Sequence, residues 1–73
     1  MYQRIRDLRE DNDLTQSKIG QAIGVPQRTY SYYETGERMV PPEVLIRLAK
    51  VYDTSVDYIL GLTDERKPYP RKK

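Results

Sequence analysis

Four side chains that can donate hydrogen bonds, none of them a carboxylate, recur within the segment 27–34. They are Gln27, Arg28, Ser31 and Tyr32. If the segment is a helix, this spacing puts them mostly on one face, while Tyr30 and Tyr33 lie on the other and are predicted to be core residues rather than stacking platforms. An arginine fork and a glutamine amide suit partners with paired acceptor and donor atoms, such as base edges. The alternative is an ordinary solvated helix face.

Catalytic chemistry has little support in this composition. The chain contains no cysteine and no histidine. Thiolate nucleophiles, imidazole bases and the common zinc-ligand sets are therefore excluded. The carboxylates, lysines and hydroxyls that remain form no recognisable constellation, such as a glycine-rich phosphate loop followed by lysine. We expect a protein that is not an enzyme and that uses no metal and no cofactor.

A tight turn must position the polar face. Gly24 can adopt the left-handed conformation that ends a helix, and Pro26 biases Val25 toward an extended one. Before this turn we expect a helix that begins at an N-cap, Thr15, and ends near Gly24. Its predicted apolar face consists of Ile19, Ala22 and Ile23.

Three more helices are expected around this pair. The first covers residues 2–12, with Ile5 and Leu8 facing inward. The fourth starts at Pro41-Pro42 and runs to residue 53, and the short fifth is capped by Thr54 or Ser55 and ends at Leu60. The apolar positions of these last two helices are Val44, Leu45, Leu48, Ala49, Tyr52, Val56, Ile59 and Leu60. The predicted fold class is all-α, with one five-helix domain over residues 1–64 and a basic tail over 65–73.

The charge is modest in sum and uneven in distribution. The formal net charge is +2, but five basic residues crowd the last eight positions. We expect this tail to be disordered, and its role stays open between a solubilising end, the start of a longer segment and a DNA-binding arm. No run approaches the roughly 18 to 20 apolar residues of a membrane span, so we expect a cytoplasmic protein with no membrane partner.

Motifs dispersed over all five predicted helices resemble the Cro and phage-repressor family, also called XRE-type or Cro/C1-type helix-turn-helix regulators. They are Leu14-Thr15-Gln16, Gly24-Val25, Tyr33-Glu34-Thr35-Gly36, Leu45, Leu48-Ala49 and Val56-Asp57-Tyr58-Ile59-Leu60-Gly61. The resemblance covers about residues 2–64. It implies a lambda-repressor-like fold whose recognition helix, at 27–34, enters the major groove of DNA.

The resemblance also implies roles for single residues. Gln27, Arg28 and Tyr32 match positions that face base edges, and Ser31 shares their face. Gln16 matches a glutamine that holds a DNA phosphate, and Thr29 and Arg38 are further candidates for phosphate contacts. Arg9 and Glu34 match a salt bridge between the first and third helices. The alternative for this pair is two exposed charges.

Two departures from the family pattern affect the recognition helix. Pro26 stands where the family often has serine or threonine, so the side-chain cap is absent. Tyr32 replaces a shorter amide or basic residue, and three alternatives remain for it: its hydroxyl on a phosphate, its ring against a thymine methyl, or no contact.

The function that the resemblance implies is sequence-specific binding of double-stranded DNA by a transcriptional regulator, most often a repressor. Such regulators bind operators as homodimers, with half-sites roughly 34 Å apart. Tyr58, Leu60 and Leu62 are the candidates for the dimer interface. The rival hypothesis is an antitoxin or protein-interaction module on the same fold, which a salt titration of DNA binding would separate.

Overall fold

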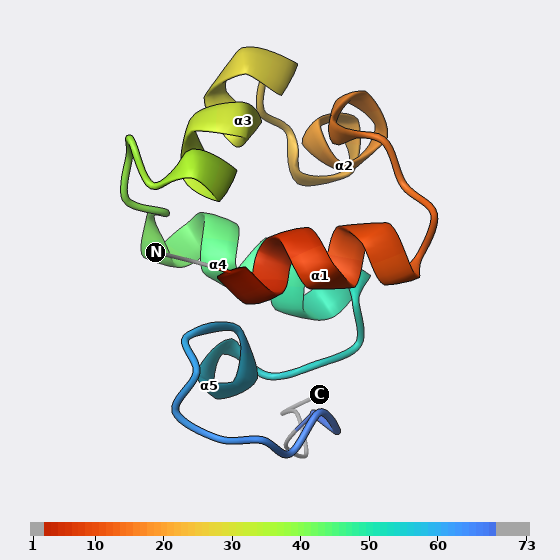
Figure 1. Cartoon of the computed structure of the whole chain (residues 1–73), viewed down its shortest axis with the longest axis vertical. Coiled ribbons are helices and arrows are strands. Elements are labelled where there is room, and N and C mark those ends of the chain that lie inside the picture. The colour runs from red at the N-terminus through yellow and green to blue at the C-terminus, as the bar shows by residue number, and fades with distance from the viewer. Residues whose placement is uncertain (1–2, 69–73) are drawn as a thin grey trace.

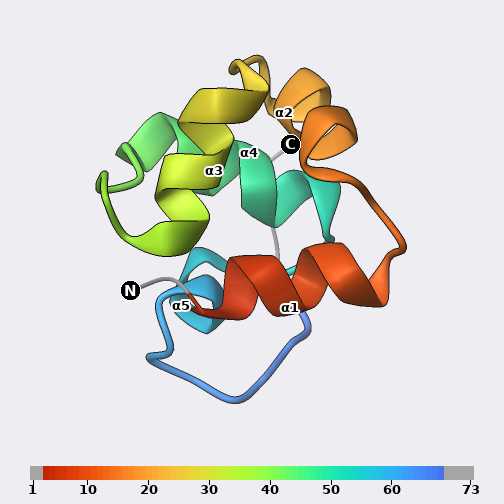
Figure 2. The ribbon, with the colours of Figure 1, turned by 45° about the horizontal axis from the view of Figure 1, so that its top comes forward.

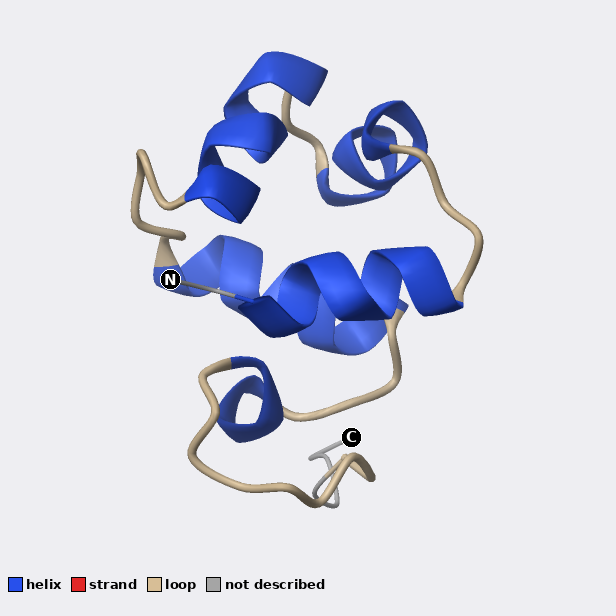
Figure 3. Ribbon diagram, viewed as in Figure 1, coloured by secondary structure: helices blue, strands red, loops and turns tan. Residues whose placement is uncertain are grey.

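Five helices form within residues 3–68, the part of the chain that this computed structural model describes (Figure 1). They are α1 (Gln3–Asp11), α2 (Gln16–Ile23), α3 (Gln27–Thr35), α4 (Pro42–Val51) and α5 (Val56–Ile59). The same part of the chain contains no strand (Figure 3). The predicted all-α class with five helices is confirmed, and the observed ends differ from the predicted ones by a residue or two.

Local chemistry explains where the helices start. Thr15 Oγ1 accepts a hydrogen bond from Lys18 N at 3.1 Å, so the predicted cap of α2 is confirmed. Of the two candidates for α5, Ser55 is the cap, because its Oγ accepts from Tyr58 N at 3.0 Å. Helix α4 begins at Pro42, where a missing N–H is tolerated, and ends two residues before the predicted end. There Asp53 has a φ of 52°, outside the range of a right-handed helix.

The core draws apolar side chains from all five helices. Its buried members are Ile5, Leu8, Ile19, Ile23, Tyr30, Tyr33, Val40, Val44, Leu45, Leu48, Ala49, Tyr52 and Ile59. Tyr30 and Tyr33 are buried, as predicted. Burial also raises the pKa of Tyr30 above its ordinary value and raises that of Tyr52 to about 12. All three tyrosine rings are therefore core residues.

Two apolar residues that the sequence predicted to face the core lie outside it. Ala22 is exposed, because the buried stripe of α2 runs through Ile19, Gly20 and Ile23, and position 22 is nearly opposite Gly20 around the helix. Leu60 follows the last residue of α5 and is 41% exposed. The inward positions predicted for these two residues were wrong.

The helices divide the molecule into two ends along its longest axis. Helices α2 and α3 pack against each other at one end, and α5 lies at the other, with α1 and α4 between them (Figures 1 and 2). Helix α1 contacts both α3 and α5, and α4 contacts both α2 and α5. The predicted turn between α2 and α3 is thus held on a platform made by α1 and α4.

The chain after α5 folds back over the end that carries this helix. Arg4 Nη1 donates to the carbonyl oxygens of Tyr58 and Thr63, at 3.0 and 2.6 Å, and Thr54 Oγ1 donates to that of Arg66 at 2.7 Å. We call residues 61–68 the strap. Its contacts depart from the disorder expected after Asp64, whereas residues 69–73 of the predicted tail lie outside the described residues. Across residues 3–68, no helix is long and apolar enough to cross a membrane.

Candidate nucleic-acid interface

The turn between α2 and α3 fixes the direction of the candidate recognition helix. Gly24 has the left-handed φ of 75° that its role as a helix end predicts. Val25 N donates to Gly20 O at 2.9 Å, and Pro26 is extended, with no side-chain cap on α3. Gly20 matters because a Cβ at this position would lie 2.9 Å from the carbonyl oxygen of Val25. The backbone of the turn therefore packs directly on the backbone of α2.

The side chains predicted to contact bases come together on the open side of α3. An open hollow in the surface is lined by Gln16, Gln27, Arg28, Ser31 and Tyr32. Gln27 and Arg28 are exposed at the first turn of α3, whereas Ser31 and Tyr32 are half-buried further along. No carboxylate lines the hollow, so an anionic ligand meets donors and the positive charge of Arg28.

The other two residues predicted to contact phosphates, Arg38 and Thr29, do not line the hollow. The guanidinium of Arg38 lies over the ring of Tyr32, with 5.1 Å from Arg38 Cζ to the ring centroid. This contact brings a positive charge from the loop after α3 to the rim of the hollow. Thr29 is half-buried in α3 and is not among the side chains that line the hollow.

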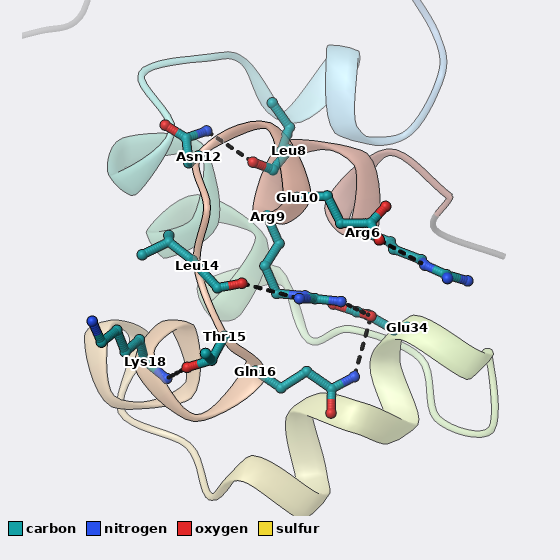
Figure 4. Close-up of polar contacts among 10 residues, drawn as sticks. All are labelled: Arg6, Leu8, Arg9, Glu10, Asn12, Leu14, Thr15, Gln16, Lys18 and Glu34. Atoms are coloured by element: carbon teal, nitrogen blue, oxygen red, sulfur yellow. Dashed lines mark hydrogen bonds and ion pairs between the residues drawn. The ribbon is translucent and has the colours of Figure 1, made fainter.

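Three side chains from three helices form a connected polar group next to the hollow (Figure 4). Arg9 of α1 pairs with Glu34 of α3, with 2.6 Å from Nε to Oε2 and 3.1 Å from Nη2 to Oε1. Gln16 Nε2, at the start of α2, donates to Glu34 Oε1 at 3.2 Å. Arg9 and Glu34 thus form the ion pair expected from the resemblance. The bond from Gln16 is an addition that the sequence did not indicate.

This environment keeps Glu34 ionised. Burial by itself raises the pKa of Glu34, but the hydrogen bonds, led by those from Arg9, outweigh it and hold the pKa below its ordinary value. The same hydrogen bond raises the pKa of Arg9. The pair is therefore charged at neutral pH, and each charge compensates the other.

Sequence reasoning missed three residues that hold elements together: two of them, Gly20 and Arg47, hold the site in place, and the third, Arg4, holds the strap at the other end of the molecule. Gly20 makes the close approach just described, and a glycine inside a helical pattern was the signal that could have found it. Arg47 Nη1 donates to the carbonyl oxygen of Ile23 at 3.0 Å, which ties the end of α2 to α4. Arg4 binds the strap. No short-range sequence pattern indicates the contacts of Arg47 and Arg4, because their partners are distant in sequence.

These features define a class of domain: five helices, of which the second and third form a helix-turn-helix with an exposed polar face on the third. A family model described as Helix-turn-helix matches residues 5–59. The chain belongs to this family.

Comparison with known proteins gives the same family. The chain is 43% identical over 74 residues to the uncharacterized HTH-type transcriptional regulator YobD of Bacillus subtilis, a match that covers 100% of this chain and 66% of YobD. It is 40% identical over 53 residues to the cryptic phage CTXphi transcriptional repressor RstR of Vibrio cholerae, which covers 73% of this chain and 48% of RstR. The chain thus spans at most about two thirds of either relative's length.

A solved structure supports the fold. The P22 c2 repressor protein, crystallised in complex with synthetic operator 9T, superposes with a TM-score of 0.75 at 31% sequence identity. The match covers 80% of this chain and 88% of the repressor chain. The five-helix arrangement is therefore that of a phage-repressor domain.

Proposed function

We propose that this domain binds double-stranded DNA in a sequence-dependent manner. The protein is a cytoplasmic transcriptional regulator, and it represses transcription by occupying its operator. The observation that carries the proposal is the hollow lined by donors from α2 and α3 without a carboxylate. The similarity to the transcriptional repressor RstR and to the P22 c2 repressor, the latter in complex with a synthetic operator, supports the same function.

In this function α3 lies in the major groove. Gln27 and Arg28, in its exposed first turn, read base edges, because an arginine fork matches the two acceptors of guanine and a glutamine amide matches adenine. Ser31 and Tyr32 complete the reading face. Gln16, Thr29 and Arg38 contact phosphates, which set the register of the protein on the duplex without carrying sequence information.

Two copies of the domain bind one operator in this proposal. A homodimer places two recognition helices about one helical turn of DNA apart, roughly 34 Å. The proposed interface is the region of Tyr58, Leu60 and Leu62, of which Leu62 is 73% exposed. Tyr58 is already covered on one side by Arg4, whose Cζ lies 4.2 Å from the ring centroid.

The experiment compares Arg28→Ala with wild type on two duplexes. A cognate duplex is first selected from a random pool, where a palindromic consensus is expected, and a scrambled duplex serves as the reference. We expect Arg28→Ala to lose about 1–3 kcal/mol on the cognate duplex and much less on the scrambled one, at one fixed salt concentration. Gln16→Ala is the matched control and should lose the same factor on both.

Two results would contradict the proposal. Equal losses for Arg28→Ala on the two duplexes would make Arg28 a phosphate contact and remove the reading face from the start of α3. A pool from which no duplex is enriched would instead favour a protein-interaction module on this fold.

A further inference from the structure

Gln16 is the one predicted phosphate contact whose side chain is already engaged in a specific bond within the free domain. Its Nε2 lies 3.2 Å from Glu34 Oε1, and Glu34 is fixed in turn by Arg9 through two hydrogen bonds. The side chains of Arg9 and Glu34 are only 15% and 6% exposed. Gln16 itself is half-buried and lines the hollow.

Arg9 holds both supports of this glutamine. Besides Glu34, its guanidinium donates from Nη1 to the carbonyl oxygen of Leu14 at 3.0 Å. Leu14 directly precedes Thr15, the cap of α2. One guanidinium therefore fixes the acceptor of the Gln16 amide and the backbone from which the Gln16 helix begins.

The side-chain amide of Gln16 uses only one of its N–H donors in these contacts. A primary amide has two N–H donors on its nitrogen. One of them is directed to Glu34, and this bond fixes the orientation of the amide. The second remains available to a ligand in the hollow that Gln16 lines.

Charge compensation makes the arrangement compatible with an anion. An isolated carboxylate next to Gln16 would repel a phosphate, but the Arg9 charge neutralises that of Glu34 at a contact of 2.6 Å. The amide can therefore be oriented by a carboxylate without placing net negative charge beside the DNA.

We propose that Arg9 and Glu34 are positioning residues for the DNA-phosphate contact of Gln16: they fix its amide before DNA arrives, so that the free N–H already faces the phosphate. The inference rests on the proposed function. Its expected size is about two- to tenfold in affinity, which corresponds to ordering one flexible side chain in advance.

The test is a double-mutant cycle between the ion pair and Gln16. The variant Arg9→Met/Glu34→Leu removes both charges together and keeps the side-chain volume. In the wild-type background we expect it to weaken binding about two- to tenfold, equally on cognate and scrambled duplexes. In the Gln16→Ala background the same replacement should change affinity little, because no amide is left to position.

A second ion pair of α1 provides the matched control. The side chains of Arg6 and Glu10 are more than half exposed, with 3.8 Å from Arg6 Nε to Glu10 Oε2, and they lie apart from Gln16 (Figure 4). Arg6→Met/Glu10→Leu should therefore affect binding equally in the Gln16 and Gln16→Ala backgrounds. If the Arg9/Glu34 replacement is additive in the same way, the inference is wrong while the proposed function stands.

A measurement on the wild-type domain keeps the inference testable even where a variant fails to fold. NMR of side-chain amides should show Gln16 ordered and shifted relative to Gln21, an exposed glutamine of the same helix. Equal mobility of the two amides in the free domain would overturn the inference. A domain with an ordered Gln16 that binds no duplex would instead overturn the proposed function.

Discussion

At the scale of single residues, Arg9 and Glu34 are the most buried ion pair in the described part of the chain. Removing two charges from water opposes folding, and the attraction between them offsets this only when the geometry is good. Here two hydrogen bonds join the groups, so the geometry is good. The loss of one partner strands the other charge beside the core.

We therefore predict that the single variants Arg9→Met and Glu34→Leu destabilise the domain more than the double variant does. Each single change should lower the free energy of unfolding by on the order of 2–3 kcal/mol. This is less than the roughly 3–5 kcal/mol of a fully buried pair, because solvent reaches the edge of this one. Urea unfolding of the three variants at pH 7 measures the effect, and losses that simply add would exclude the compensation.

The dependence on pH provides the control for this prediction. The folded-state pKa of Glu34 is depressed, so its contribution to stability is present above the unfolded-state pKa and is lost as the pH falls through the folded-state value. The difference between wild type and Glu34→Leu should therefore shrink in acid. A difference that stays constant from pH 7 to strongly acidic pH would show that lost packing, and not lost charge, causes it.

The sequence allowed the ion pair to be predicted but not the bond from Gln16 to Glu34. The pair follows from a family resemblance at two positions. The Gln16 bond depends on how closely α2 approaches α3, and that distance is set by Gly20 and the turn, which sequence patterns do not quantify. A long flexible side chain has many rotamers, and only the packed structure selects one.

At the scale of elements, the junction of α2 and α3 depends on small side chains. Gly24 and Pro26 were predictable as turn residues, because each has a distinct backbone preference. Gly20 stands out in the sequence only as a glycine inside a helical pattern, and its role was not predictable, since its small size matters only where the Val25 carbonyl folds back on it. Residues whose role is defined by a tertiary contact are the ones that local patterns miss.

We predict that Gly20→Ala destabilises the domain by about 1–3 kcal/mol, although alanine is the better helix former by about 1 kcal/mol. The new Cβ would lie 2.9 Å from a backbone oxygen, so the turn must move. DNA affinity should fall with stability, because the turn sets the direction of α3.

Ala22→Gly, at an exposed position of the same helix, is the control and reports the effect of helix propensity alone. A stabilised Gly20→Ala variant would show that the turn has room for a methyl group.

At the scale of the whole molecule, the strap and the candidate interface lie at opposite ends of the longest axis, which is 32 Å long (Figures 1 and 2). Arg4 anchors the strap to α5: it donates to the carbonyl oxygens of Tyr58 in α5 and Thr63 in the strap, and it pairs with Asp64 of the strap at 2.7 Å. Fully extended, residues 69–73 reach at most roughly 18 Å from Pro68. This geometry argues against residues 69–73 as an arm on the duplex that α3 contacts.

Two truncations separate the strap from the tail. A chain ending at Pro68 keeps every described contact and removes Arg71, Lys72 and Lys73, so we predict unchanged stability, DNA affinity and salt dependence. A chain ending at Asp64 also lacks Arg66, whose carbonyl oxygen accepts from the buried Thr54 hydroxyl. It should lose about 1 kcal/mol of stability and keep the same DNA affinity where it is folded.

Arg38→Ala is the positive control, because losing one phosphate contact should reduce the slope of log affinity against log salt by about 0.9. If the truncation at Pro68 reduces that slope by a similar amount or more, the tail reaches DNA, and the strap does not hold it at the far end of the molecule.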